Sequence, residues 1–229
     1  MKTLGLLGGM SWESTVPYYR LINEAVKARL GGLHSAKILL ASVDFGEIEP
    51  LMRSARWEEA GERLGRCAAV LERGGAHALV LCTNTLHKVA PAIERAVTIP
   101  LLHILDPTAA AVQHAGISKV GLLATAFTME GAFYLERLRS CGLDVVVPDA
   151  ADRATVHRII FEELCRGCVL DASRRACLQV IDRLAEAGAQ GIIFGCTEIA
   201  MLISPGDSPL PVFDTTALHA AHAAEWALA

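Results

Sequence analysis

Short apolar runs alternate with longer segments of helical character along the whole chain. The runs are three or four residues long and contain only apolar side chains and glycine, and they cover Leu4–Leu7, Ile38–Leu40, Leu79–Leu81, Val120–Leu123, Val145–Val147 and Ile192–Phe194. Runs without polar alternation are typical of strands that are covered on both faces. Because they alternate with helical segments, the pattern predicts an α/β fold built on parallel sheets.

The polar segments between the runs predict helices and one functional loop. We expect helices over about 14–29, 57–73 and 215–228, and a loop over 43–56 that carries Met52, Arg53 and Ser54. Ligands of open α/β sheets bind beyond the carboxyl ends of strands, so this loop should point to the same end as Met10. Arg53 is a candidate for binding a substrate carboxylate, although a solvated surface arginine is an equally good interpretation.

Two stretches of the chain share one layout. An apolar run, a small polar turn and a helix follow one another at 78–87, around Thr83-Asn84-Thr85, and again around Cys196-Thr197-Glu198. The runs that begin at Leu4 and Val120 match at nearly the same offset, about half the chain. This similarity predicts an internal duplication whose two halves bring both polar turns to one cleft.

Cys196 stands where a strand should give way to a short helix, at 199–203. Unpaired N–H groups and the positive end of a helix dipole favour anions, so we expect this thiol to ionise more easily than a free one. A buried structural cysteine is the alternative for this stretch taken alone.

Composition narrows the class of protein. The 229 residues are 52% hydrophobic without a low-complexity tract, which indicates a globular protein with a substantial core. A net charge of −4 argues against nucleic acid as a partner, and no apolar run is long enough for a membrane span or signal peptide. Seven scattered cysteines indicate free thiols in a reducing cytoplasm.

Three other motifs carry little function. The turn 8–14 lacks the residues of a Walker loop or a dinucleotide fingerprint. The Cys165-Arg166-Gly167-Cys168 motif closes a helix, whereas a redox motif would open one. His219 and His222 lie without an acidic or thiol neighbour, so we expect a surface helix end and no metal site.

Two small polar groups that face one cleft suit proton transfer at a stereocentre. One group removes the α-proton from one face of the substrate, and the other supplies a proton to the opposite face. Backbone N–H groups at the helix starts could hold the carboxylate and the developing negative charge. This scheme requires no cofactor.

The chain resembles the aspartate/glutamate racemase family, the cofactor-independent amino-acid racemases. The resemblance covers essentially the whole chain and rests on the opening Leu4–Thr15, on Asn84-Thr85-x-His87, on Phe161-Glu162-Glu163 and on Gly195–Glu198. It implies two similar parallel-sheet α/β domains related by a pseudo-two-fold axis, with the active site between them. The expected domains are 1–103 with 210–229, and 104–209. The family also implies a homodimer and a small amino-acid substrate.

The catalytic residues are carried over position by position. Cys196 matches the family's second catalytic cysteine, which serves the L-face. The first one normally stands directly before Asn-Thr, where this chain has Thr83, and Cys82 lies one residue earlier. A shift of one residue turns a strand side chain to the opposite face, so Cys82 should not substitute. We expect an asymmetric enzyme that handles D-substrate badly.

Substrate choice stays open at this point. Aspartate-specific relatives carry a lysine where this chain has Cys165, next to Arg166. L-Aspartate and L-glutamate are the first expectation, with Met10, Met52, Arg53, Ser54, Asn84, Thr85, Thr197 and Glu198 as substrate-binding residues. The alternatives are a broad-specificity amino-acid or hydantoin racemase, a maleate-type isomerase, and a catalytically weakened amino-acid-binding protein. A thiol hydrolase lacks a specific Cys–His–Asp pattern.

Overall fold

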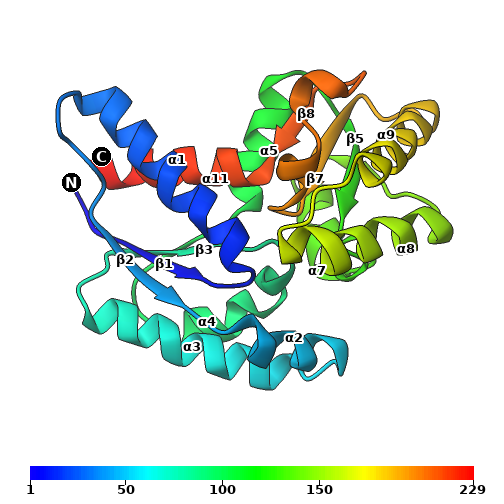
Figure 1. Ribbon diagram of the computed structural model, residues 1–229. Coiled ribbons are helices and arrows are strands. Elements are labelled where there is room, and N and C mark those ends of the chain that lie inside the picture. The colour runs from blue at the N-terminus through cyan, green and yellow to red at the C-terminus, as the bar shows by residue number, and fades with distance from the viewer. The chain divides into compact units, whose positions relative to one another are not determined.

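The computed structural model describes residues 1–229 and divides them into two compact units. Unit 1 comprises Met1–Ile104 with His219–Ala229, and unit 2 comprises Leu105–Leu218 (Figure 1). The segment 210–218, which the sequence analysis assigned to the first domain, groups with unit 2 because it contains a strand that pairs with the sheet of that unit.

Unit 1 is built on a four-stranded parallel sheet in the order β2-β1-β3-β4. Its strands are β1 (Leu4–Gly8), β2 (Ile38–Ser42), β3 (Ala78–Leu81) and β4 (Leu101–Leu102). Its helices are α1 (Trp12–Leu30), α2 (Phe45–Arg53), α3 (Trp57–Arg73), the 3₁₀ turn η1 (Thr85–Val89), α4 (Ala90–Arg95) and the later part of α11 (Thr215–Leu228).

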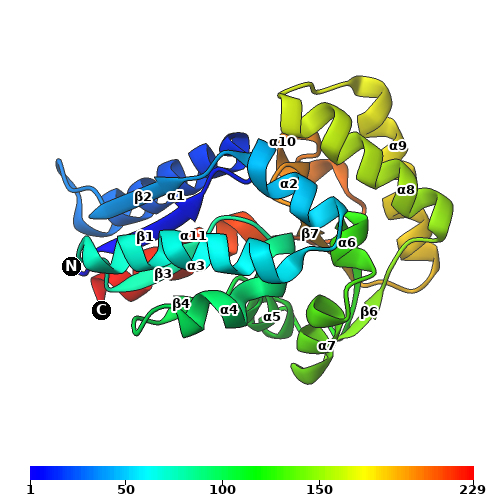
Figure 2. The ribbon, with the colours of Figure 1, turned by 90° about the horizontal axis from the view of Figure 1, so that it is seen from below.

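Helices cover both faces of this sheet, which explains its continuous apolar runs. α1 and α11 lie on one face, and α3 and α4 lie on the other, nearest the viewer in Figure 2. On the first face, Leu4 and Leu6 pack with Tyr18 of α1 and Ala223 of α11 in one buried cluster. On the second face, Gly5 gives α3 room, since a Cβ there would lie 3.2 Å from the Cβ of Leu71.

Unit 2 repeats the topology of unit 1, with the order β6-β5-β7-β8. Its strands are β5 (Lys119–Ala124), β6 (Asp144–Val146), β7 (Gly191–Gly195) and β8 (Val212–Asp214). Its helical segments are α5 (Leu105–His114), α6 (Ala126–Met129), α7 (Ala132–Ser140), α8 (Ala150–Arg158), the π turn η2 (Ile159–Glu163), η3 (Leu164–Arg166), α9 (Asp171–Glu186), α10 (Ile199–Leu202), η4 (Pro205–Asp207) and the start of α11.

The shared strand order agrees with the duplication inferred from the sequence. In both units the first strand of the repeat, β1 or β5, lies between the second and the third. The predicted α/β class with two parallel sheets is therefore confirmed. The strand β8 was not predicted, because three residues that end in Asp214 carry too weak an apolar signal.

The predicted loop over 43–56 is wrong in its centre, which forms α2. Asp44 caps this helix by accepting a hydrogen bond from the N–H of Gly46 at 2.9 Å. Ile48, Leu51 and Met52 lie at helical spacing and are buried together. Pro50 lies inside the helix and conceals this pattern from a reading that treats proline as a loop residue.

His219 also differs from expectation, since it is fully buried instead of lying at a surface helix end. The Tyr18 hydroxyl lies 2.9 Å from Nδ1 of His219, and Nε2 lies 2.7 Å from the carbonyl oxygen of Leu102. A neutral imidazole satisfies both contacts if Nε2–H donates to Leu102 and Nδ1 accepts from Tyr18. His219 thereby ties α11 to α1 and β4.

No helix of the protein is long and apolar enough to cross a membrane.

Replacement of His219 with phenylalanine should destabilise unit 1. The change leaves the Leu102 carbonyl and the Tyr18 hydroxyl buried without their partner, which costs about 1–3 kcal/mol for each group. Urea unfolding followed by circular dichroism measures the loss. Tyr18→Phe is the control, because it removes one donor only and should cost less than His219→Phe. Equal stability of His219→Phe and wild type would contradict the structural role.

Candidate functional site

In unit 1, the turn after β1 is a tight glycine turn. Gly9 has φ +88°, and a Cβ at this position would lie 2.2 Å from the carbonyl oxygen of Val43, so only glycine fits. The N–H of Gly9 donates to Oγ1 of Thr15 at 2.8 Å, which holds the turn against the start of α1. Met10 follows and is buried just beyond the carboxyl end of β1.

Glu13 is a residue of this turn that the sequence analysis did not select. It lies in the first turn of α1, and its Oε2 atom is buried without a hydrogen-bond partner. A buried carboxylate oxygen without a donor is costly, so such an atom points to a ligand that supplies the donor. The sequence signal was weak, because acidic residues are common in the first turn of a helix.

The second turn of unit 1 follows β3 and contains Thr83, Asn84 and Thr85, all of them buried. His87 supports this turn from η1. Nδ1 of His87 lies 2.7 Å from the carbonyl oxygen of Thr83, and the N–H of Ile104 donates to Nε2 at 3.3 Å. An accepting Nε2 fixes a neutral ring whose Nδ1–H donates to Thr83. The backbone at Thr83 is therefore held in place by a side chain.

Cys82, the first residue after β3, is buried in the core of unit 1. It belongs to the fully buried cluster that contains Leu6 and Tyr18. Burial raises the pKa of the Cys82 thiol far above its usual range. This cysteine therefore stays neutral in the core, in line with the expectation that it does not replace a catalytic thiol.

Strand register relates the turn at Thr83 to the turn at Cys196. Leu7 pairs with Leu81 in unit 1, and Leu123 pairs with Phe194 in unit 2. One residue further along, Ala124 pairs with Gly195, so Gly195 corresponds to Cys82. Thr83 and Cys196 therefore hold equivalent places in the two units.

In unit 2, the thiol of Cys196 faces a carboxylate. Its Sγ donates a hydrogen bond to Oε2 of Glu198 at 3.0 Å, and Oγ1 of Thr197 donates to the same oxygen at 2.6 Å. All three residues are buried. The turn after β7 thus places an acid and a base in direct contact, with Thr197 fixing the carboxylate.

The thiol of Cys196 is harder to ionise than the sequence suggested. Burial raises its pKa well above the usual range, and the neighbouring Glu198 charge raises the pKa further. The expected helix dipole is weak here, because α10 has only four residues. Ionisation of Cys196 therefore needs a proton acceptor, and Glu198 is in hydrogen-bond contact with it.

Two more side chains complete the surroundings of Cys196. Sγ of Cys165 lies 3.6 Å from Oε1 of Glu198, so this cysteine contacts the same carboxylate. Tyr134 is fully buried, and a Cβ on Gly195 would lie 3.2 Å from its hydroxyl. Tyr134 was missed by the sequence analysis, since nothing in the helix that carries it indicates a contact more than sixty residues along the chain.

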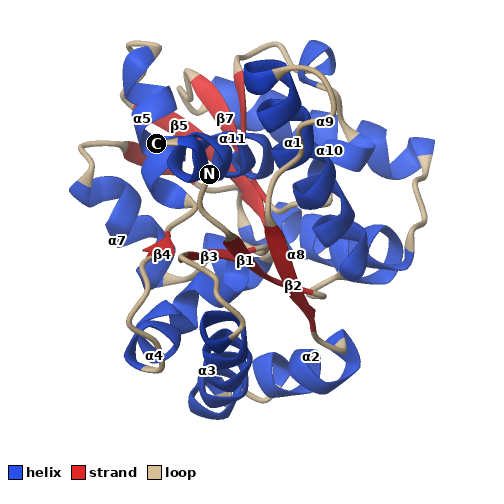
Figure 3. Ribbon diagram, turned by 90° about the vertical axis from the view of Figure 1, so that its left-hand side faces the viewer, coloured by secondary structure: helices blue, strands red, loops and turns tan.

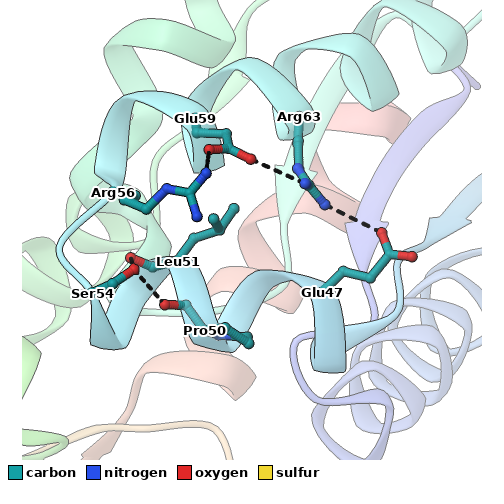
Figure 4. Close-up of polar contacts among 7 residues, drawn as sticks. All are labelled: Glu47, Pro50, Leu51, Ser54, Arg56, Glu59 and Arg63. Atoms are coloured by element: carbon teal, nitrogen blue, oxygen red, sulfur yellow. Dashed lines mark hydrogen bonds and ion pairs between the residues drawn. The ribbon is translucent and has the colours of Figure 1, made fainter.

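The three predicted residues at the end of α2 differ in how far their side chains are exposed. Met52 is buried, whereas Arg53 and Ser54 are exposed. The Arg53 side chain is 75% exposed and pairs with Glu49 at 2.5 Å, one turn earlier in the helix. The Ser54 hydroxyl donates back to the carbonyl of Pro50 at 2.7 Å (Figure 4). Arg53 and Ser54 are thus engaged within their own helix.

A charged groove of about 740 Å³ runs between α2 and α3. Arg63 contacts Glu59 at 3.0 Å and Glu47 at 3.4 Å, and Arg56 also pairs with Glu59 (Figure 4). These pairs are largely exposed, where ion pairs contribute about 0–1 kcal/mol to stability. The groove contains no predicted site residue.

The structure contains no cluster of metal ligands and no disulfide bond. No group of three or more His, Cys, Asp or Glu side chains is placed to hold a metal ion. All seven cysteines are free. The candidate functional groups lie in three turns, which are the glycine turn and the Thr83 turn of unit 1 and the Cys196 turn of unit 2.

Known proteins share both the sequence and the fold of this chain. A family model described as Asp/Glu/hydantoin racemase matches residues 7–223. A crystal structure of a "putative Asp/Glu racemase" from Yersinia pestis is 56% identical, with a TM-score of 0.92 and coverage of 100% of both chains. The structure of an aspartate racemase homologue from Pyrococcus horikoshii is 32% identical, with a TM-score of 0.86 and full coverage of both chains.

Another relative has a name that indicates a broader range of substrates. The broad-specificity amino-acid racemase RacX of Bacillus subtilis is 24% identical over 219 residues, which cover 93% of each chain. Similarity therefore extends to proteins with different stated substrates.

Replacement of Glu198 with glutamine should lower the pKa of Cys196, because the neighbouring negative charge disappears. More thiolate then exists at neutral pH, so alkylation of Cys196 by iodoacetamide should be several-fold faster than in the wild type. Mass spectrometry of the labelled peptide measures the rate against pH. Glu162→Gln, an exposed carboxylate of the same unit, is the control. Unchanged or slower labelling would show that the Glu198 charge does not govern this thiol.

Proposed function

The chain belongs to the Asp/Glu/hydantoin racemase family, and we propose that it is a cofactor-independent amino-acid racemase that uses Cys196 and Thr83 on opposite faces of the substrate. One observation carries the proposal. A thiol in contact with a carboxylate stands on a turn that is equivalent, by strand register, to the turn of Thr83. Two equivalent turns with different proton-carrying groups suit inversion of a stereocentre.

The proposed reaction begins at Cys196. Glu198 takes the proton of the thiol, and the resulting thiolate removes the α-proton of the L-amino acid. The electron pair of the broken C–H bond delocalises into the substrate carboxylate. The Thr83 hydroxyl then donates its proton to the opposite face of Cα, and its oxygen regains a proton from water. Glu198 later releases its proton, so the enzyme returns to its initial state.

Thermodynamics limits which kinetic constants can differ between the two enantiomers when the catalytic pair is asymmetric. The two enantiomers of an amino acid have equal free energies, so kcat/KM for racemisation must be the same in both directions. The expectation that D-substrate is handled badly is therefore wrong if it refers to kcat/KM. The asymmetric pair can instead give different kcat values and different KM values for the two enantiomers. It can also make the two enantiomers exchange their α-protons with solvent at different rates.

Replacement of Thr83 with alanine should separate exchange from inversion. Cys196 can still remove and return the α-proton of an L-amino acid, whereas the proton donor for the other face is lost. In D₂O, the variant should incorporate deuterium into L-substrate with retention, while racemisation falls by about 10²–10⁴-fold. Proton NMR measures exchange, and polarimetry or chiral chromatography measures inversion.

Thr83→Ser and Cys196→Ala are the matched variants for this experiment. The serine variant keeps a hydroxyl and should retain inversion, and the alanine variant should lose both exchange and inversion. Racemisation at the wild-type rate in Thr83→Ala would remove Thr83 from the mechanism. The absence of exchange in the wild-type protein with every amino acid tested would overturn the proposed function itself.

Glu13 fits the α-ammonium group of such a substrate. Its buried Oε2 atom lacks a donor, and an ammonium supplies charged N–H groups. The residue lies in the turn that follows β1, the strand next to β3 and therefore next to the Thr83 turn. We assign Glu13 to substrate binding on this basis.

Replacement of Glu13 with glutamine should weaken amino-acid binding selectively. Loss of a charged hydrogen bond should raise KM by about tenfold to a hundredfold. L-Malate, in which a hydroxyl replaces the ammonium of L-aspartate, is the control ligand, and its inhibition constant should change little. An equal loss of affinity for malate would show that Glu13 only supports the shape of the turn.

The substrate class is the remaining part of the proposal. Around Cys196 the printed contacts of this turn come from a carboxylate, a second thiol and a hydroxyl group. L-Aspartate or L-glutamate would need a cation such as Arg53, which would have to leave Glu49. The similarity to RacX supports a second candidate, a racemase of neutral amino acids as well. The exchange experiment with acidic and neutral amino acids distinguishes the two.

A further inference from the structure

Two thiols of unit 2 contact the two oxygens of one carboxylate. Cys196 donates a hydrogen bond to Oε2 of Glu198 at 3.0 Å, and Cys165 donates one to Oε1 at 3.6 Å. The reaction proposed above uses Cys196 and Glu198 but gives Cys165 no step. A second thiol therefore stands beside the proposed catalytic thiol and the base that serves it.

The fold of unit 2 keeps the two thiols near each other. Cys165 lies in η3, and η3 packs against α10, the helix that follows the Cys196 turn. Figure 3 shows α9, which comes after η3 in the chain, on the same side of β7 as α10. Cys165 also raises the pKa of Cys196, after burial and the Glu198 charge. Because such interactions weaken with distance, this effect agrees with two sulfur atoms that are close in space.

Glu163 fixes the segment that carries Cys165. Its Oε1 atom pairs with Arg158 of α8 at 2.8 Å, and its Oε2 atom accepts a hydrogen bond from Ser173 of α9 at 2.5 Å. The carbonyl oxygen of Glu163 accepts a further bond from the N–H of Cys168 at 3.0 Å. These bonds tie the ends of the segment to the helices before and after it. Cys165 is thus held toward Glu198 by an anchored turn.

The two thiols differ in their access to solvent. The Cys196 residue is only 6% exposed, whereas Cys165 is half-buried. Oxidation of a thiol follows its exposure and its thiolate character, so a small oxidant reaches Cys165 first. The product is a sulfenic acid, which condenses with a neighbouring thiol to a disulfide. Cys196 is such a thiol, and Glu198 is in contact with it to accept its proton.

Cys168, the other cysteine of the C-x-x-C motif, is less suited as the partner of Cys165. Its side chain is exposed, and its Sγ atom lies 3.8 Å from the carbonyl oxygen of Arg166. Gly167 has φ +72° and turns the chain between the two cysteines. The Cys165 thiol instead points to the carboxylate that also holds Cys196. The geometry therefore favours a pair that the spacing of the motif does not indicate.

We propose that a peroxide converts Cys165 and Cys196 into a disulfide, which blocks the Cys196 turn until a thiol reductant opens it again. This inference rests on the proposed function, in which Cys196 acts as a thiol. Formation of the bond requires Glu198 to give up its contacts with both thiols. The disulfide is reversible, so it protects Cys196 from the irreversible oxidation to a sulfinic or sulfonic acid.

The chemistry balances in two steps. First, Cys165 passes its proton to Glu198, and the thiolate attacks one oxygen of hydrogen peroxide. The O–O bond breaks, and the leaving hydroxide takes the proton from Glu198 to form water. Second, Cys196 passes its proton to Glu198, and its thiolate attacks the sulfur of the sulfenic acid, so that the S–O bond breaks and a second water leaves with that proton. The two sulfur atoms are oxidised, and the peroxide is reduced.

Peptide mapping of the full-length protein tests the pairing. Trypsin separates the three cysteines concerned, which fall in the peptides 159–166 (Cys165), 167–174 (Cys168) and 184–229 (Cys196). The protein is treated with hydrogen peroxide, and the remaining thiols are then blocked with N-ethylmaleimide. Mass spectrometry without reduction should find peptide 159–166 joined to peptide 184–229. Dithiothreitol should separate the two peptides.

Exchange of the α-proton of an L-amino acid in D₂O measures the effect on activity. The wild type should lose exchange as the linked peptides accumulate, and it should regain exchange after dithiothreitol. Cys165→Ser cannot form the bond, so peroxide should cause a loss, relative to its own untreated activity, that dithiothreitol does not restore. Cys168→Ser is the matched control, and its loss and recovery should follow those of the wild type.

Any of three results contradicts the proposal. They are a treated wild type without the link between 159–166 and 184–229, a link from Cys165 to Cys168 in its place, and full recovery of Cys165→Ser by dithiothreitol. Mapping of the wild type needs neither a variant nor activity, so its outcome is independent of the racemase proposal. Absence of exchange in the untreated protein, by contrast, overturns the racemase proposal and leaves the mapped disulfide unaffected.

Discussion

The contact between the Cys196 thiol and the Glu198 carboxylate is the constraint on which the proposed racemase chemistry depends. A buried thiol beside a negative charge is a weak acid, so it serves as a base only if its proton has a place to go. The same carboxylate that opposes ionisation is also the acceptor within reach. Thr197 and Cys165 contact the same carboxylate and help to hold this acceptor in place.

The two units support their equivalent turns by different means. In unit 2 the side chain that is proposed to react, Cys196, itself contacts a neighbouring carboxylate. In unit 1 the support reaches the backbone, through the neutral ring of His87 at the Thr83 carbonyl. A hydroxyl that donates a proton needs no neighbour to ionise it, whereas a thiol that is proposed to act as a base needs an acceptor for its proton. The difference in support is thus consistent with the difference between Thr83 and Cys196.

Much of the fold could be predicted from the sequence, because buried parallel strands leave uninterrupted apolar runs. The helix over 57–73 and the turns at Thr83 and Cys196 follow from such local patterns. The helix α2 was missed because Pro50 lies inside it and suggests a loop. Its buried residues can be recognised only when the elements that pack against them are known. The burial of His219 depends on Tyr18 and Leu102, which are remote in sequence, so no local pattern could indicate it.

The same limit applies to the candidate site. The sequence indicates which residues stand at the ends of strands, but the raised pKa of Cys196 depends first on the burial of the thiol and then on the Glu198 carboxylate, which turns back toward it. Likewise, the unsatisfied oxygen of Glu13 is visible only when every neighbouring donor has been placed. Position along the chain predicts candidates, whereas protonation follows from packing.

The course of the chain through α11 has a consequence for synthesis on the ribosome. Unit 2 is continuous in sequence and ends at Leu218, so all of its strands are synthesised before the segment His219–Ala229 of unit 1. The buried cluster of unit 1 requires Ala220, Ala223, Ala224 and Ala227, which are made after every residue of unit 2. During translation the first sheet must therefore wait, with the apolar face that α11 will cover still open.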